Sequence, residues 1–134
     1  MQPQILLVDD NPIQAVTRKA ILERTGFSVK AFNSAREALR FLKEEEGKSI
    51  ELVITDHIMP ELAGPAFVRL LRDINPQIPV VVVSGLADAE NEYQGYNVVF
   101  RTKPVAPDEL QALAISLLDS PINEIVSKDF FPRQ

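Results

Sequence analysis

The stretch ILLVDDNP, residues 5–12, joins a run of four apolar residues to two adjacent carboxylates, Asp9 and Asp10. An apolar run of this length that ends in polar residues is typical of a short strand buried in a sheet. Two like charges at the end of such a strand repel each other and raise each other's pKa. We therefore expect a positively charged group close to Asp9 and Asp10.

Four further apolar runs follow along the chain: SVKAF (28–32), LVIT (52–55), PVVVV (79–83) and NVVF (97–100). Three of the five runs are almost continuous in valine, isoleucine and leucine, which indicates strands buried on both faces, as in a parallel sheet. Helical patterns lie between the runs. This alternation predicts an α/β fold, an open doubly wound sheet with helices on both faces.

Capping signals indicate where the first two helices begin and end. Asn11 is a favoured N-cap residue, Pro12 suits the first position of a helix, and Gly26 suits the position after its end. Ser34 and Glu37 have the spacing of a capping box, which predicts the start of the second helix. These signals place the first two helices between the first three apolar runs.

Two later helices are predicted by apolar residues at helical spacing, over residues 65–74 and 107–118. The segment 86–96, between the last two predicted strands, contains few apolar residues and ends in glycine and tyrosine. Only a short or frayed helix is expected there.

Composition and charge narrow the classes of function. The chain has 134 residues, of which 46% are hydrophobic, as expected for one globular domain with a buried core. The net charge of −5 argues against general electrostatic binding to nucleic acid or to a membrane surface. The absence of cysteine excludes thiolate sites, and a single histidine excludes a multi-histidine zinc site. No segment resembles a signal peptide or a transmembrane helix, so we expect a cytoplasmic protein.

Polar residues follow the predicted strands at the edge where open α/β sheets bind their ligands, beyond the carboxyl ends of the strands. They are Asp9 and Asp10 after the first strand, Asp56 after the third, Ser84 after the fourth and Lys103 after the fifth. Three carboxylates with one lysine carry excess negative charge, which a hard cation such as Mg²⁺ would neutralise. A carboxylate in such a site can also act as a nucleophile toward phosphorus and form an aspartyl phosphate.

The single histidine, His57, directly follows Asp56. Neighbouring residues of a strand face opposite sides of the sheet, so its side chain should point away from the carboxylate of Asp56. We expect neither a metal site nor a phosphohistidine at this residue, because a lone histidine has no partners for such a site.

Four motifs occur in a characteristic order: VDDN (8–11), DHIMPELAG (56–64), SG (84–85) and TKPV (102–105). Together they resemble the receiver domain of two-component response regulators, over roughly residues 3–119. The resemblance implies a flavodoxin-like (βα)5 fold with five parallel strands in the order 2-1-3-4-5. It also implies a receiver domain over residues 1–119, followed by a C-terminal tail over residues 120–134.

The resemblance implies a Mg²⁺ site and a phosphoacceptor. Asp56 would accept the phosphoryl group. Asp10 would bind Mg²⁺ directly, and Asp9 would bind it directly or through a water molecule. Asp56 itself and the backbone carbonyl of Ile58 would be further metal ligands.

The resemblance also implies roles for residues that contact the phosphoryl group or change position when the domain is phosphorylated. Lys103 would pair with the phosphoryl group, and Ser84 would donate a hydrogen bond to it once Asp56 is modified. Phe100 matches the aromatic position that turns inward on activation. The family usually has a cis peptide bond before the proline that follows the lysine, here Pro104.

Two departures from the family bear on signal lifetime and output. Ile58 and Leu86 would flank the aspartyl phosphate, and because neither side chain can orient an attacking water, slow self-dephosphorylation is predicted. The segment between Ser84 and Lys103 is shorter than in typical receivers, mostly at the expense of the fourth helix. We expect residues 86–96 to be mobile and to order differently on phosphorylation. The oligomeric state is left open.

The resemblance implies a signalling domain that assists its own phosphorylation and dephosphorylation, not an enzyme acting on other substrates. Its partners would be a histidine kinase or histidine phosphotransfer protein, and a downstream protein or output domain that the sequence does not identify. Direct nucleic acid or membrane binding is not expected. One alternative is a receiver-like interaction module that works without phosphorylation. Another is a Mg²⁺ phosphatase, but Ile58 stands where such an enzyme usually has a second acid.

The tail after the last predicted helix reads DSPINEIVSKDFFPRQ, residues 119–134. Asp119 or Ser120 could cap a short extra helix with Pro121 at its first position. This helix would pack back on the domain. Alternatively, the tail would serve as a linker or docking segment, because Phe130 and Phe131 would be costly to leave exposed. The sequence leaves open whether the chain is a stand-alone receiver or part of a larger regulator or hybrid kinase.

Overall fold

The computed structural model describes residues 4–130, and for residues 119–130 it describes the backbone alone. Five parallel strands form one sheet in the order β2-β1-β3-β4-β5. This is the predicted strand order and confirms the flavodoxin-like fold. The strands are β1 (Gln4–Val8), β2 (Ser28–Phe32), β3 (Ile50–Asp56), β4 (Val80–Ser84) and β5 (Val99–Thr102).

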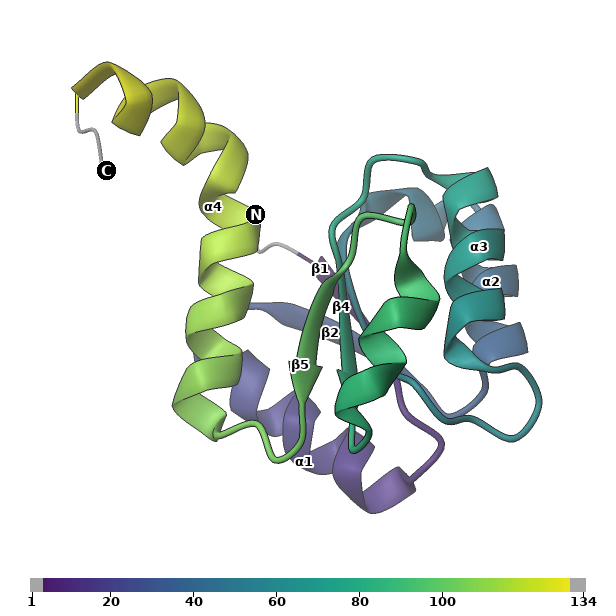
Figure 1. Cartoon of the computed structure of the whole chain (residues 1–134). Helices are drawn as coiled ribbons and strands as arrows, with labels where there is room; N and C mark the ends of the chain where they lie inside the picture. The colour runs from purple at the N-terminus through teal and green to yellow at the C-terminus, as the bar shows by residue number, and fades with distance from the viewer. Residues whose placement is uncertain (1–3, 131–134) are drawn as a thin grey trace.

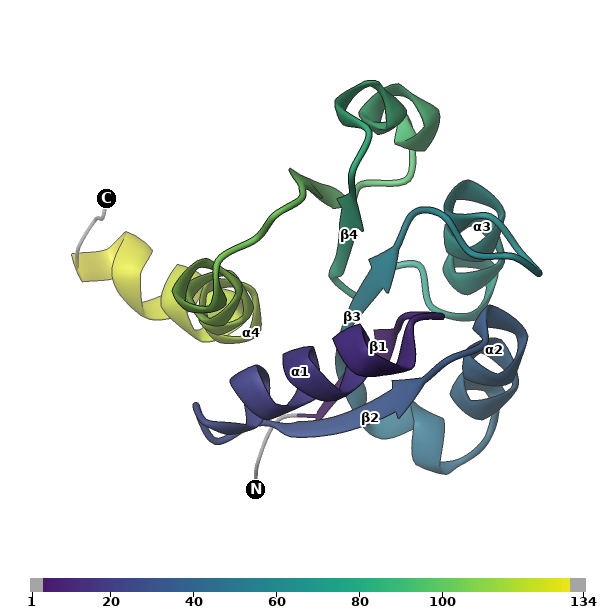
Figure 2. The ribbon, with the colours of Figure 1, turned by 90° about the horizontal axis from the view of Figure 1, so that it is seen from below.

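Helices cover both faces of the sheet, as Figures 1 and 2 show. The α-helices of the described chain are α1 (Pro12–Glu23), α2 (Ala35–Lys43), α3 (Gly64–Ile74) and α4 (Pro107–Phe130). Two 3₁₀-helices are added, η1 (Glu46–Ser49) and η2 (Ala87–Tyr93). Seen along the sheet, α1 and α4 lie on one face, whereas α2, α3 and η2 lie on the other (Figure 2).

The core consists of two layers, one on each face of the sheet. Successive residues of a strand point alternately into one layer and into the other. Leu6 and Val8 of β1 contribute to the layer beneath α2 and α3, while Ile5 and Leu7 contribute to the layer beneath α1 and α4. All four side chains are fully buried. Both faces of the central strands are therefore apolar, which is why their sequences show continuous rather than alternating hydrophobicity.

The predicted capping signals of the first two helices are confirmed. The side-chain oxygen of Asn11 accepts hydrogen bonds from the backbone N–H groups of Ile13 and Gln14, at 3.0 and 3.1 Å. The hydroxyl of Ser34 accepts one from the N–H of Glu37 at 3.3 Å. Gly26 has a positive φ of 95°, a conformation that suits glycine after a helix end.

The last helix differs from the prediction. Its backbone continues from Pro107 to Phe130, so the predicted end at residue 118 and the predicted cap at Asp119 or Ser120 are wrong. Pro121 lies inside the helix, and a proline there removes one hydrogen bond and bends a helix without having to end it. The ribbon of α4 bends in its second half (Figure 1). The predicted packing or docking of the tail depends on side chains that the structure does not describe.

The segment between β4 and β5 forms the 3₁₀-helix η2, in agreement with the short helix expected over residues 86–96. Only Ala89 and Tyr93 of η2 are buried, so few side chains hold it to the sheet. Within the described part of the chain, no helix has the length and apolar character needed to span a membrane.

Candidate functional site

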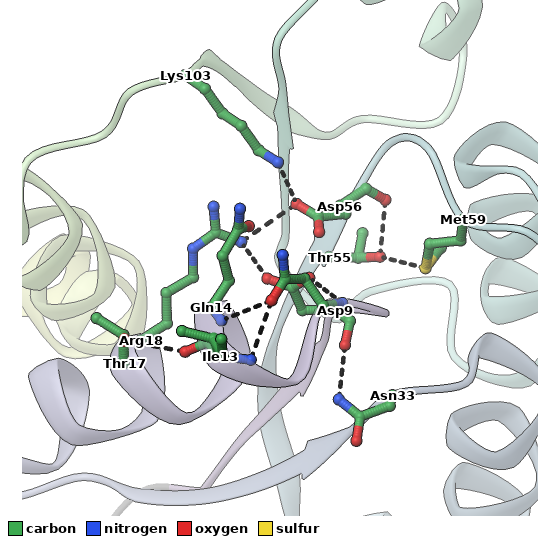
Figure 3. A network of polar contacts seen from close by, with 11 residues as sticks. Asp9, Ile13, Gln14, Thr17, Arg18, Asn33, Thr55, Asp56, Met59 and Lys103 are labelled. Atoms are coloured by element: carbon green, nitrogen blue, oxygen red, sulfur yellow. Dashed lines mark hydrogen bonds and ion pairs between the residues drawn. The ribbon is translucent and has the colours of Figure 1, made fainter.

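The candidate site lies at the carboxyl ends of the strands, where three carboxylates meet. Figure 3 shows two of them, Asp9 and Asp56. The pairing of β1 with β3 places Val8 opposite Thr55, so the residues that follow, Asp9 and Asp56, are neighbours. Asp10 is exposed at the start of the next loop. One carboxylate oxygen from each of Asp9, Asp10 and Asp56 lies within 4.8 Å of the others. The structure thus brings together the three acids that the sequence analysis singled out.

Asp9 is fully buried, with 0% of its surface exposed. One carboxylate oxygen accepts a hydrogen bond from the backbone N–H of Asn11 at 2.9 Å, and the other lies 2.9 Å from Nη1 of Arg18. Burial raises the pKa of Asp9 to about 7, and a hydrogen bond shared with Asp56 and repulsion from its charge act in the same direction. The Asn11 N–H and the Arg18 charge lower this pKa, but less than the other effects raise it.

Asp56 is 3% exposed and carries two ion pairs on one oxygen. Its Oδ1 lies 3.2 Å from Nζ of Lys103 and 3.2 Å from Nη1 of Arg18. Lys103 follows β5 and reaches the acid across the end of β4, and its backbone N–H donates to the carbonyl of Ser84 at 2.7 Å. The peptide bond between Lys103 and Pro104 is cis, as expected from the resemblance.

Arg18 is the residue of the site that the sequence analysis did not identify. It lies on α1 between Ala15 and Leu22, three residues after one and four before the other, and both of these are buried against the sheet. The sequence signal for Arg18 was a basic residue at the spacing of the apolar residues that face the sheet. Together with Lys103, Arg18 supplies the positive charge that the adjacent carboxylates led us to expect.

The hydroxyl of Ser84 is buried and engaged within its own loop. It accepts a hydrogen bond from the N–H of Leu86 at 2.9 Å and contacts the carbonyl of the same residue at 3.4 Å. Leu86 and Ile58 are 54% and 64% exposed, one in each loop beside the acids. Phe100 is buried, with its ring centroid 6.0 Å from that of Tyr93 on η2.

His57 has two polar partners within the fold. Its Nδ1 lies 2.6 Å from the hydroxyl of Tyr93, and its Nε2 lies 3.8 Å from a carboxylate oxygen of Glu92. Both partners come from η2, whose fold over the end of β3 is a tertiary arrangement that the local sequence does not reveal. Gly64 makes this possible, because a Cβ at that position would collide with the Tyr93 hydroxyl.

The donor set fits a hard divalent cation. All three candidate side chains offer carboxylate oxygens, which Mg²⁺ prefers, and Asp10 keeps the site open to solvent and hence to coordinated water. Burial is the main cause of the raised pKa of Asp9, and the neighbouring charge of Asp56 adds to it. A cation among these oxygens would favour the ionised form of Asp9.

Comparison with known proteins now settles the family. The family model described as the response regulator receiver domain matches residues 5–115. The chain belongs to the response regulator receiver domain family. This receiver domain therefore carries its acidic cluster, its lysine and its cis-proline on the family's own fold, together with Arg18 inside the cluster.

Individual relatives place the receiver domain in proteins of different length. The two-component response regulator ORR1 of Oryza sativa subsp. japonica is 37% identical over 100 residues, covering 68% of this chain and 42% of that protein. The sensor kinase CckA of Brucella abortus is 31% identical over 118 residues, covering 86% of this chain and 12% of that protein. The chain thus spans less than half the length of either relative.

Among solved structures, a CheY-like receiver domain protein from Methanospirillum hungatei JF-1 superimposes with a TM-score of 0.84, covering 92% of this chain and 99% of that one. The sequence identity is 24%, so this likeness concerns the fold of the receiver domain alone.

Proposed function

We propose that this receiver domain accepts a phosphoryl group from a phosphohistidine of a histidine kinase or phosphotransfer protein onto Asp56, with Mg²⁺ as cofactor. The observation that carries the proposal is the approach of three carboxylates within 4.8 Å, with Nζ of Lys103 at 3.2 Å from Oδ1 of Asp56. Receiver domains are signalling domains, so the phosphorylated state would regulate a partner protein or output domain.

In this proposal the residues of the chain have distinct tasks. A carboxylate oxygen of Asp56 attacks phosphorus, the phosphorus–nitrogen bond of the phosphohistidine breaks, and the imidazole keeps the electron pair. Lys103 is held where its ammonium group stabilises charge on the transferring phosphoryl oxygens.

Asp9, Asp10, Asp56 and the backbone carbonyl of Ile58 would hold Mg²⁺. When bound, the metal neutralises the acids and the phosphoryl oxygens. Neither Ile58 nor Leu86, both exposed and apolar, could orient water for dephosphorylation.

The proposed switch runs through Ser84 and η2. After phosphorylation, Ser84 would exchange its hydrogen bonds with Leu86 for one to a phosphoryl oxygen, which would move the start of the segment 86–96. Phe100 and His57 contact Tyr93 at the other end of η2, so they would respond to the same movement. The change is a shift between two populated conformations. Amide exchange of residues 86–96 that is slow and identical with and without phosphate would contradict it.

The boundaries and the location of the protein are part of the proposal. We assign residues 1–119 to the receiver domain and residues 120–134 to a tail that links or docks it. A histidine kinase partner that consumes ATP would place the protein in the cytoplasm.

A phosphorylation-independent interaction module is the second candidate, because Arg18 already neutralises two of the acids without a metal. Intact-mass spectrometry separates the two functions. Incubation with acetyl phosphate and Mg²⁺ should add one phosphoryl group to the chain. The addition should fail in Asp56→Asn and in the presence of EDTA. An unmodified parent chain under all conditions would favour the interaction module.

A further inference from the structure

The feature that the proposed reaction does not use is Arg18, whose guanidinium lies inside the acidic cluster (Figure 3). Its side chain is only 14% exposed. Burying a guanidinium is costly unless it is paired with acids. Nη1 alone contacts both Asp9 and Asp56, at 2.9 and 3.2 Å, so these acids stabilise the position of Arg18 and Arg18 stabilises theirs.

A divalent cation at this site would bind two of the same carboxylates, those of Asp9 and Asp56. Mg²⁺ approaches its oxygen ligands to about 2.0–2.1 Å, so a metal shared by Asp9 and Asp56 would lie only a few ångströms from Nη1. Two positive charges at such a distance repel each other strongly in a buried site. The charge of Arg18 therefore opposes metal binding as long as both of its ion pairs are kept.

An alternative acceptor is present one helical turn away. Gln14 precedes Arg18 by four residues on α1, so the two side chains are neighbours on the helix surface (Figure 3). Among the described residues, Oε1 of Gln14 is a buried side-chain oxygen without a hydrogen-bond partner. A guanidinium that turns away from the acids would find in this oxygen an acceptor that needs a donor.

We propose that Arg18 is the resident counter-ion of the acidic cluster, which competes with Mg²⁺ for Asp9 and Asp56 and so lowers the metal affinity of this receiver domain. The inference rests on the proposed Mg²⁺ site, but it concerns metal binding and not phosphoryl transfer. Arg18 is a positioning residue in this account. It keeps the metal-free cluster neutralised and moves toward Gln14 when the metal binds.

The test measures Mg²⁺ affinity by calorimetric titration of the full chain. Arg18→Met keeps the apolar stem and removes the charge, and we expect it to bind Mg²⁺ about tenfold more tightly than the parent. Tenfold corresponds to about 1.4 kcal/mol, the scale of one hydrogen bond to a charged group. Lys19→Met is the matched control, because it removes the same charge from the same helix at a side chain paired with Glu23 outside the cluster. Its affinity should remain within about twofold of the parent.

A second readout guards against a folding defect in the variant. Metal-free Arg18→Met should melt at a lower temperature than the parent, and Mg²⁺ should raise its Tm by more than it raises that of the parent. Arg18→Lys, which retains the charge, should bind Mg²⁺ nearly as weakly as the parent.

Equal or weaker Mg²⁺ binding by Arg18→Met would overturn the inference, and so would the absence of Mg²⁺ binding by both chains. If Arg18→Met binds more tightly but Asp56 is never phosphorylated, the inference stands and the proposed function falls.

Discussion

Replacement of Asp9 by asparagine should stabilise the metal-free protein. Asp9 is fully buried beside Asp56, and its pKa rises from the ordinary value of 3.8 to about 7. The rise means that the folded protein favours the protonated form. The stability associated with Asp9 is therefore present below about pH 4 and is lost as the pH rises toward 7.

The magnitude follows from the size of this shift. Three pKa units at 1.36 kcal/mol each amount to roughly 4 kcal/mol at pH well above 7. Loss of the ion pair with Arg18 and relaxation of the neighbouring charges reduce this value, so we expect a gain on the order of 2 kcal/mol for Asp9→Asn. The amide oxygen can still accept the hydrogen bond from the N–H of Asn11, so the loop that begins α1 is preserved.

Urea unfolding followed by circular dichroism in EDTA measures the effect. At about pH 8 the free energy of unfolding of Asp9→Asn should exceed that of the parent, and the gap should close near pH 4. Asp10→Asn is the matched control, because Asp10 is exposed and its replacement should change the free energy much less. Addition of Mg²⁺ should narrow the gap, because the metal stabilises only the chain that binds it well. An Asp9→Asn protein that is no more stable than the parent at pH 8 in EDTA refutes the reasoning.

Three further predictions concern the neighbours of the site. Gly64→Ala should lower the free energy of unfolding by roughly 1–3 kcal/mol, because the new methyl group collides with Tyr93. Gly85→Ala is the control, because its methyl group meets open space and the variant should unfold like the parent. Equal denaturation midpoints for the two variants would argue against the collision. Burial and the Glu92 charge raise the pKa of Tyr93, so the folded protein favours the un-ionised phenol and loses stability as the pH rises above about 10. Tyr93→Phe should lose stability less steeply over this range in alkaline urea titrations, and parallel pH profiles would contradict this. Ile58→Glu should shorten the lifetime of the aspartyl phosphate by providing a group that orients water, and an unchanged lifetime in a phosphate-release assay would show that Ile58 does not set it.

The strands and the acids could be predicted because both depend on short-range signals. Continuous apolar runs identify buried parallel strands, and residues that follow such strands meet at one edge of the sheet. Asp9 and Asp56 are adjacent for this reason alone, since the register of β1 and β3 aligns Val8 with Thr55. The N-cap at Asn11 was equally local and was also found.

Arg18 and the partners of His57 could not be predicted in the same way. Whether a cation in an apolar helical stripe turns inward depends on how the helix is rotated against the sheet, and α1 turns Arg18 toward the acids. The contact of His57 with Tyr93 depends on the path of η2, a segment with few buried side chains. The end of α4 was mispredicted because proline was taken as a helix start, although a helix interior can accommodate it with a bend.

The central claim is that Asp56 receives the phosphoryl group within a Mg²⁺-dependent acidic cluster. The most direct measurement treats the chain with acetyl phosphate and Mg²⁺, reduces the product with borohydride, and maps the peptides by tandem mass spectrometry. Because borohydride converts an aspartyl phosphate to homoserine, we expect homoserine at position 56 and unmodified aspartate at positions 9 and 10. Reduction at Asp9 or Asp10 in place of Asp56, or aspartate retained at all three positions, would contradict the account.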